Sequence, residues 1–193
     1  MRAIPYNVFM NRCTTDVVRK CDASRIGCGG YLIVDDTPYF FTFEYEEWER
    51  KAFDNKILAI GDLEMQGIAV LLHLAGPYLR HHTFTLLCDN FGSVAQLNNL
   101  RIRDEATAHL VDSIHTSTST NDVRVYIEHI AGELNTGADQ ASRNKLKLFF
   151  KLMRTLTRKK PVDLTHLIPS RLRSLRTAVR VRGYAAARKK VSQ

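Results

Sequence analysis

Four acidic residues in this chain have the order and spacing that two-metal phosphodiester chemistry requires. They are Asp22, Glu64, Asp89 and Asp139. Hydrolysis of a phosphodiester needs an activated water and relief of charge on the leaving oxygen, and two divalent ions about 4 Å apart can supply both. Magnesium prefers hard oxygen ligands, so a cluster of carboxylates would be the protein's contribution. The four acids therefore predict metal-dependent chemistry on a phosphodiester.

The first half of the chain has the composition of β-strands. Strands are expected at 16–23, 29–34 and 39–45, where β-branched and aromatic residues are frequent. The stretch Asp35-Asp36-Thr37-Pro38 has the chemistry of a turn between the second and third strands. We therefore expect a three-stranded antiparallel meander, with Asp22 at the end of its first strand.

Helices and strands alternate in the second half. Apolar residues recur at helical spacing after an N-cap expected at Asp54 or Asn55, as far as Gly76. Beyond this helix, we expect a strand at 83–88, helices at 93–100 and 105–116, a strand at 123–130, and a last helix from Thr136 through Lys145 to Arg154. Strands linked by helices extend a sheet in parallel. The predicted fold class is α/β, a mixed five-stranded sheet of three antiparallel strands and then parallel strands, flanked by helices.

This order of elements gives the four acids a shared location. Asp22 and Asp89 end two strands that we expect to be neighbours, so their carboxylates would lie side by side. Glu64 lies on the helix that crosses the sheet. Asp139 falls in the first turn of the last helix, where the helix dipole favours an acid.

The charge of the chain is divided unevenly along its length. The net charge is +8, yet the segment from Arg143 onward holds 16 of the 28 basic residues and a single acid, Asp163. An acidic body with a strongly basic tail indicates a polyanionic partner held by the tail. Within the body, an acidic cluster is expected to form a solvated rim, and its members are Glu44, Glu46, Glu47 and Glu49.

Composition also bears on the compartment. The four cysteines, at positions 13, 21, 28 and 88, form no C-x-x-C pair and are interpreted as buried thiols of an intracellular protein. No apolar run approaches the roughly 18 residues of a membrane span, so no membrane partner is expected. We expect a nuclear or cytoplasmic protein. The start of the chain lacks acids through Thr15 and carries Arg2 and Arg12, which keeps the mitochondrion as a further option.

Four motifs around the acids resemble those of one family. They are Cys21-Asp22-Ala23-Ser24 followed by Cys28-Gly29-Gly30, then Leu63-Glu64, then Leu87-Cys88-Asp89-Asn90, and finally the run from His129-Ile130-Ala131-Gly132 to Ala138-Asp139-Gln140-Ala141-Ser142-Arg143. Together they resemble the ribonuclease H domain of the retroelement type, carried by reverse-transcribing elements and pararetroviruses. The resemblance covers about residues 16–145. It leaves an N-terminal extension at 1–15 and a basic tail at 146–193, which we expect to be helical and partly disordered.

The resemblance implies a reaction and a set of site residues. Asp22, Glu64, Asp89 and Asp139 would hold two Mg²⁺ or Mn²⁺ ions, and the substrate would be the RNA strand of an RNA–DNA hybrid. One ion would activate the attacking water and the other would stabilise the leaving 3′-oxygen. Contacts to nucleic acid are expected from residues at the strand ends and in the tail, namely Ser24, Arg25, Asn90, Arg143, Lys145, Arg171, Arg173, Arg176, Arg180 and Arg182.

Other interpretations remain open at the level of sequence. The chain could be a domesticated ribonuclease H-like module that binds RNA as a structural component of a ribonucleoprotein complex. As an enzyme, it could act with a reverse transcriptase or within a larger ribonucleoprotein. An integrase or junction resolvase of the same fold ranks last, because such enzymes usually lack the first-helix glutamate seen at Glu64. His129 is expected to have a structural role in its strand.

Overall fold

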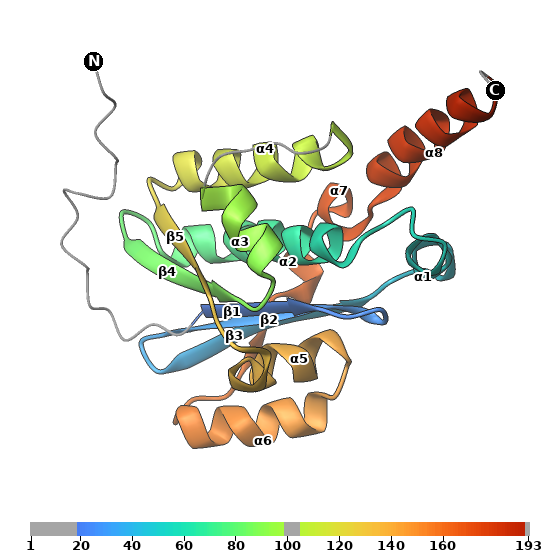
Figure 1. The fold of residues 1–193 in the computed structure, drawn as a ribbon. Helices are drawn as coiled ribbons and strands as arrows, with labels where there is room; N and C mark the ends of the chain where they lie inside the picture. Colours follow the sequence, from blue (N-terminus) through green and yellow to red (C-terminus); the bar gives the residue numbers. More distant parts are fainter. Residues whose placement is uncertain (1–18, 99–104, 192–193) are drawn as a thin grey trace, which may run out of the picture.

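A six-stranded mixed sheet lies at the centre of the computed structural model, which describes residues 19–98 and 105–191 (Figure 1). The strand order is β5-β4-β1-β2-β3-β6. Five sequence predictions fall wholly or partly outside the described residues. These are the extension at 1–15, the buried thiol expected at Cys13, the start of the strand expected at 16–23, the end of the helix expected at 93–100, and the last two residues of the tail expected at 146–193.

The predicted antiparallel meander is confirmed. It consists of β1 (Arg19–Ala23), β2 (Gly27–Val34) and β3 (Thr37–Glu44), with β2 paired to both neighbours. The turn between β2 and β3 contains Asp35 and Asp36, whose φ angles of 47° and 62° lie in the left-handed region. A two-residue turn of type I′ requires this conformation at both central residues, and Asp is one of the few side chains that tolerate it.

The parallel half of the sheet is also confirmed, and the second edge carries one strand more than predicted. Strands β4 (Thr83–Cys88) and β5 (Arg124–His129) extend the sheet in parallel from β1. A two-residue strand, β6 (Val162–Asp163), pairs in parallel with β3. The prediction of five strands was therefore wrong by one, because two residues are too few to show an alternating pattern.

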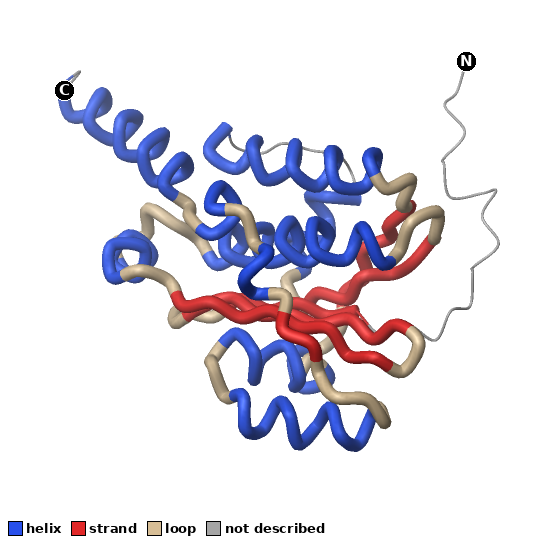
Figure 2. Tube along the Cα trace, turned by 180° about the vertical axis from the view of Figure 1, so that it is seen from behind, coloured by secondary structure: helices blue, strands red, loops and turns tan. Residues whose placement is uncertain are grey.

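Helices cover both faces of the sheet (Figures 1 and 2). One face carries α2 (Ile60–Ala75), α3 (Phe91–Asn98) and α4 (Glu105–Thr120), and the other carries α5 (Thr136–Ser142) and α6 (Leu146–Leu156). Most residues of α2 are buried, because this helix packs against both the sheet and α4.

Alternation along the strands divides the core into two clusters. Leu32 and Phe41 belong to the larger cluster on the α2 side, while their neighbours Tyr31 and Phe40 belong to the smaller one on the α5 side. The ring of Phe149 from α6 completes the smaller cluster, with its centroid 5.7 Å from that of Tyr31 and 5.1 Å from that of Phe40. Because side chains alternate between the two faces of the sheet, β2 and β3 each contribute residues to the core on both sides.

The helix predicted to start at Asp54 or Asn55 begins later. Asp54 is the last residue of a separate helix, α1 (Glu47–Asp54), and α2 begins at Ile60. The carboxylate of Asp62 accepts the N–H of Ala59 at 2.6 Å and so satisfies a donor at the start of α2. A capping group inside the helix, rather than before it, explains why the expected N-cap was misplaced.

Glu49 is not part of a solvated rim. Glu44, Glu46 and Glu47 are exposed as predicted, but Glu49 is only 2% exposed. Its carboxylate accepts the N–H of Glu46 and, at 3.0 Å, the N–H of Leu175. Burial raises the pKa of Glu49, and these backbone bonds partly offset that effect. The acid is thus an internal tie between α1 and the C-terminal segment.

The last predicted helix is two helices. Helix α5 ends at Ser142 and α6 begins at Leu146. Between them, Asn144 has a φ of 54°, a left-handed conformation that interrupts the helical backbone and that Asn adopts more readily than most residues. The break turns α6 so that Phe149 and Met153 bury against the sheet.

The C-terminal segment, residues 157–191, returns to the α2 side of the sheet. After β6 it forms α7 (Ser170–Arg173) and α8 (Arg176–Val191), which contact α2 and α4 respectively. Leu172, Leu175 and Ala178 are fully buried in the larger core cluster. Part of the basic tail is therefore an element of the core, which charge counting could not reveal. Within the described residues, no helix combines the length and apolar character needed to cross a membrane.

This packing predicts that Leu172→Ala destabilises the whole domain. Leu172 is 0% exposed, and truncation of a buried leucine typically costs about 2–5 kcal/mol. Chemical denaturation followed by circular dichroism should show one transition shifted to lower denaturant. Leu167→Ala is the matched control, because Leu167 lies in the same segment but is 51% exposed. Equal stability of the two variants would mean that the segment does not contribute to the core.

Candidate active site

The four acids converge from four different elements. Asp22 is in β1, Asp89 directly follows the parallel neighbour β4, Glu64 is in the second turn of α2, and Asp139 is in α5. Asp22 lies close enough to Asp89 and Asp139 for both negative charges to affect its titration, and Glu64 is affected by Asp22 and Asp89 in the same way. The acids therefore share one region, as the order of the elements implied.

Two of these acids are buried, with consequences for their protonation. Asp22 is 6% exposed and Glu64 is 2% exposed. Burial raises the pKa of Asp22 to about 6, and the charges of Asp89 and Asp139 act in the same direction. Burial also raises the pKa of Glu64 to about 10, with further contributions from Cys88 and Asp22. A cation bound among these carboxylates would favour their ionised forms.

Asp22 is held by the end of α5. The hydroxyl of Ser142 donates a hydrogen bond to Asp22 Oδ2, and the hydroxyl of Ser24 donates to the carbonyl of Ser142 at 3.2 Å. Close backbone contact makes this possible, because a Cβ added to Gly29 would lie 2.5 Å from the carbonyl carbon of Ala141. Glycine is required at this position for the helix to approach the strand.

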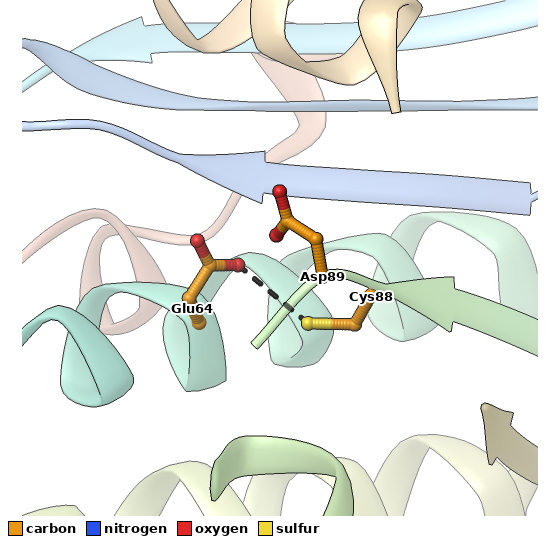
Figure 3. A group of neighbouring side chains, drawn as sticks. All are labelled: Glu64, Cys88 and Asp89. Atoms are coloured by element: carbon orange, nitrogen blue, oxygen red, sulfur yellow. Dashed lines mark hydrogen bonds between the residues drawn. The ribbon is translucent and has the colours of Figure 1, made fainter. Parts of the chain in front are cut away.

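Glu64 is held from both neighbouring strands. Its Oε1 accepts the backbone N–H of Ala23 at 3.0 Å, and the thiol of Cys88 lies 3.7 Å from its Oε2. Figure 3 shows Glu64, Cys88 and Asp89 gathered between α2 and the end of β4. One possible ligand atom from each of these three lies within 4.8 Å of the others, a spacing that could hold a metal ion.

Asp139 has a cationic neighbour instead of a buried environment. Its side chain is 38% exposed, and Nε of Arg143 lies 2.5 Å from its Oδ1, one helical turn along. The pair is accessible to solvent, so it contributes little to stability by itself. Arg143, predicted to contact nucleic acid, thus lies at the open side of the carboxylate cluster.

The other predicted contacts near the strand ends have different surroundings. Ser24 is 5% exposed, and its hydroxyl is engaged with the backbone at Ser142, so a structural role in the β1–β2 turn is evident. Arg25 is exposed and forms two hydrogen bonds with Asp54, at 2.7 and 2.6 Å. The side chain of Asn90 accepts the N–H of Ser93 at 2.9 Å and so caps the start of α3. Lys145 is exposed at the start of α6.

The tail arginines are distributed over two kinds of environment. Arg182 forms a bidentate ion pair with Asp62, at 2.5 and 2.8 Å, and donates to the carbonyl of Ile57. This pairing ties α8 to the first turn of α2, two residues before Glu64. Three others, Arg171, Arg173 and Arg176, line a cavity between α4 and the C-terminal segment, and Arg180 lines an adjoining one.

Three residues of this region were not singled out from the sequence. Ser142 and Cys88 contact the acids Asp22 and Glu64 directly. Asn135 is fully buried, and its amide donates to the carbonyl of Cys21 at 3.0 Å, which joins the start of α5 to β1. Each lies within four residues of one of the acids in the sequence, and this proximity could have identified them as part of the site.

The raised pKa of Asp22 predicts how stability depends on pH. In the folded state without metal this pKa is about 6, against an ordinary value of 3.8. Stability due to the protonated acid is complete below pH 3.8 and is lost as pH rises through 6. In EDTA at pH 8, Asp22→Asn should therefore be more stable than the wild type by about 2–3 kcal/mol, because a tenfold change in proton affinity corresponds to about 1.4 kcal/mol.

Urea denaturation at pH 3.5 and pH 8 tests this expectation. The stabilisation by Asp22→Asn should vanish at pH 3.5, and Mg²⁺ should stabilise the wild type more than the variant at pH 8. Glu105→Gln, at an exposed position in the first turn of α4, serves as the control. A stability difference that is the same at both pH values would contradict the assignment.

Comparison with known proteins reveals a likeness in structure. No protein-family model matches the chain, and no curated protein sequence matches it. Among solved structures, it is similar to ribonuclease H1 from the halophilic archaeon Halobacterium salinarum NRC-1, with a TM-score of 0.50 and 15% sequence identity. The match covers 68% of this chain and 97% of that one. The α/β fold of this chain, with its mixed sheet flanked by helices, is the ribonuclease H fold.

Proposed function

We propose that this chain is a metal-dependent endonuclease of retroelement origin that hydrolyses the RNA strand of RNA–DNA hybrids. The observation that carries the proposal is the convergence of Asp22, Glu64, Asp89 and Asp139 on one region of a ribonuclease H fold. The structural neighbour is named as a ribonuclease H1. The four motifs around these acids support the same activity, and their resemblance to retroelement domains supports the origin.

The donor set fits the metal that this activity needs. Four carboxylates offer hard oxygen ligands, which suit Mg²⁺ and Mn²⁺. Two of them are buried among like charges, an arrangement that costs free energy unless a cation is present. Two ions held by Asp22, Glu64, Asp89 and Asp139 would activate a water and offset charge on the leaving oxygen.

The chain's own residues would orient this machinery. Ser142 fixes the carboxylate of Asp22, while the N–H of Ala23 fixes that of Glu64. Arg143, half-exposed beside Asp139, is placed to meet a substrate phosphate when Asp139 takes up metal. The RNA-binding role of Ser24 is not proposed further, because its hydroxyl is buried in the turn.

Cleavage of a labelled RNA–DNA hybrid in Mg²⁺ tests the activity. Asp22→Asn and Asp89→Asn should each lower the rate by more than about a hundredfold, since even outer-shell partners of metal ligands contribute about 10- to 100-fold. Glu105→Gln is again the control and should retain full activity. A wild-type protein that binds Mg²⁺ but leaves the hybrid intact would refute the proposal.

Ser142→Ala should separate positioning of Asp22 from the chemistry itself. Loss of the hydroxyl removes a hydrogen bond to a proposed metal ligand, so we expect Mg²⁺ affinity to fall about tenfold. Isothermal titration calorimetry measures this directly, and Ser142→Thr should recover most of the affinity. Ser113→Ala, on α4, is the matched control. Unchanged affinity of Ser142→Ala would show that Asp22 is positioned by other contacts.

A second candidate is an RNA-binding module within a ribonucleoprotein or beside a reverse transcriptase, inside the cell. It is favoured by the concentration of basic residues after Arg143 and by the three arginines that line one cavity. Under this alternative, RNA binding would be tight and steeply salt-dependent, without cleavage. The hybrid assay and a salt titration of RNA binding on the same protein distinguish the two candidates.

A further inference from the structure

Two adjoining cavities lie where the C-terminal segment meets α1 and α4. The first has a volume of about 750 Å³ and is bounded by residues 170–177 on one side and by α4 on the other. The second, about 740 Å³, is bounded by Trp48 of α1 and by the first turns of α8. Arg176 and Thr177 line both cavities, so the two hollows meet at the start of α8.

The first cavity has the chemistry of a phosphate site. Arg171, Arg173 and Arg176 are all exposed and line it together with the hydroxyl-bearing residues Ser174 and Thr177. A guanidinium has five N–H donors, and Arg173 directs one of them to the carbonyl of Thr165. Arginine is well suited to bidentate bonds with phosphate oxygens.

Two acids also line this cavity and reduce its positive charge. The carboxylate of Glu46 accepts the indole N–H of Trp48 at 2.6 Å, which orients it toward α1. Asp112 lies on the α4 side, across from the arginines of the C-terminal segment. Three guanidinium groups against two carboxylates give a positive balance, and the positive charges share one wall.

The second cavity offers an aromatic surface. Trp48 is half-buried, and its partners there include Val179 and Val181. The guanidinium carbon of Arg176 lies 5.6 Å from the centre of the Trp48 ring, within the range of a cation–π contact. An indole face beside apolar side chains is a surface on which an unpaired base can stack.

We propose that the two cavities form one binding site for single-stranded nucleic acid. Phosphates of the strand occupy the arginine-lined cavity, and a base stacks against Trp48. Proteins that bind single strands combine a basic groove with an aromatic platform in this way. The site contains none of the four acids of the candidate active site, so it is independent of the proposed cleavage.

A nucleic-acid duplex does not fit both halves of this site. Bases of a duplex are paired and stacked on one another, so a duplex can offer phosphates to the arginines but no free base to Trp48. Single-stranded RNA and single-stranded DNA share the phosphate and base chemistry on which the site depends. A hybrid duplex should therefore compete poorly, and the two kinds of single strand should be compared directly.

Trp48 is the single tryptophan of the chain, so its fluorescence reports binding at this site. The full-length protein in EDTA at low salt is titrated with short oligouridine, oligothymidine or an RNA–DNA hybrid duplex. We expect saturable quenching by both single strands, because both carry the phosphates and unpaired bases that the site would bind. Absence of Trp48 quenching by both single strands, or equal quenching by the hybrid duplex, would overturn the proposal.

Variants test the two halves of the site separately by anisotropy of a labelled strand. Trp48→Leu should weaken binding about tenfold, since it removes the surface on which a base stacks. Arg176→Ala should also weaken it about tenfold, since it removes a guanidinium that binds phosphate. Trp48→Phe should recover most of the affinity. Lys151→Ala, exposed on α6 across the sheet, is the matched control.

The pattern of losses decides the outcome. If Lys151→Ala weakens binding as much as Arg176→Ala, binding reflects overall charge and the site is refuted. If Trp48→Leu is neutral while polyphosphate displaces the strand completely, the aromatic half of the site is refuted. Equal melting temperatures of the variants establish that each remains folded. Because no metal is present, these results do not depend on whether the protein cleaves hybrids.

Discussion

The close contact of α5 with the β1–β2 hairpin is the constraint on which the candidate site depends. The backbone around Ala141 approaches Gly29 so closely that any side chain at that position would collide with it. On the helix side, Gly137 leaves similar room for the ring of Tyr31. With the helix seated this way, Ser142 reaches Asp22 and Asp139 joins the other acids. The geometry of the candidate site therefore depends on two glycines, Gly29 and Gly137.

Charged side chains in this protein have two roles. Some hold elements of the fold together, and others face an open volume or the other acids, and composition alone does not separate the two. Arg182 joins α8 to α2 through Asp62, and Arg25 is paired with Asp54. Arg182 thus contributes to the fold, whereas the Arg25–Asp54 pair is exposed and the arginines around the α4 cavity face an open volume. The buried acids have the same two roles. Glu49 accepts backbone N–H groups, whereas Asp22 and Glu64 lie close enough for their negative charges to repel each other. The role of each charged group can be assigned only from the partner that it contacts in the structure.

The sequence predicted the sheet and the shared location of the acids because both depend on local patterns. Alternation identified the strands of the meander, and the positions of Asp22 and Asp89 at strand ends placed them together. It did not predict α1, because an eight-residue helix is shorter than the window over which apolar periodicity identifies a helix. It also missed the burial of Leu172 and Leu175, since burial in a basic segment depends on distant partners such as Gln66, whose amide donates to the carbonyl of Leu172.

The path of the C-terminal segment has a consequence for how the chain is made. Residues 162–178 pass around the β3 edge of the sheet and then fill the core beside α2 and α4. During synthesis these residues emerge after every strand and helix of the candidate site. Until they do, β3 is an uncovered edge strand and the part of α2 that contacts α7 is exposed, both of which favour association with other chains. The nascent domain thus remains prone to association with other chains after its proposed catalytic residues have all been synthesised.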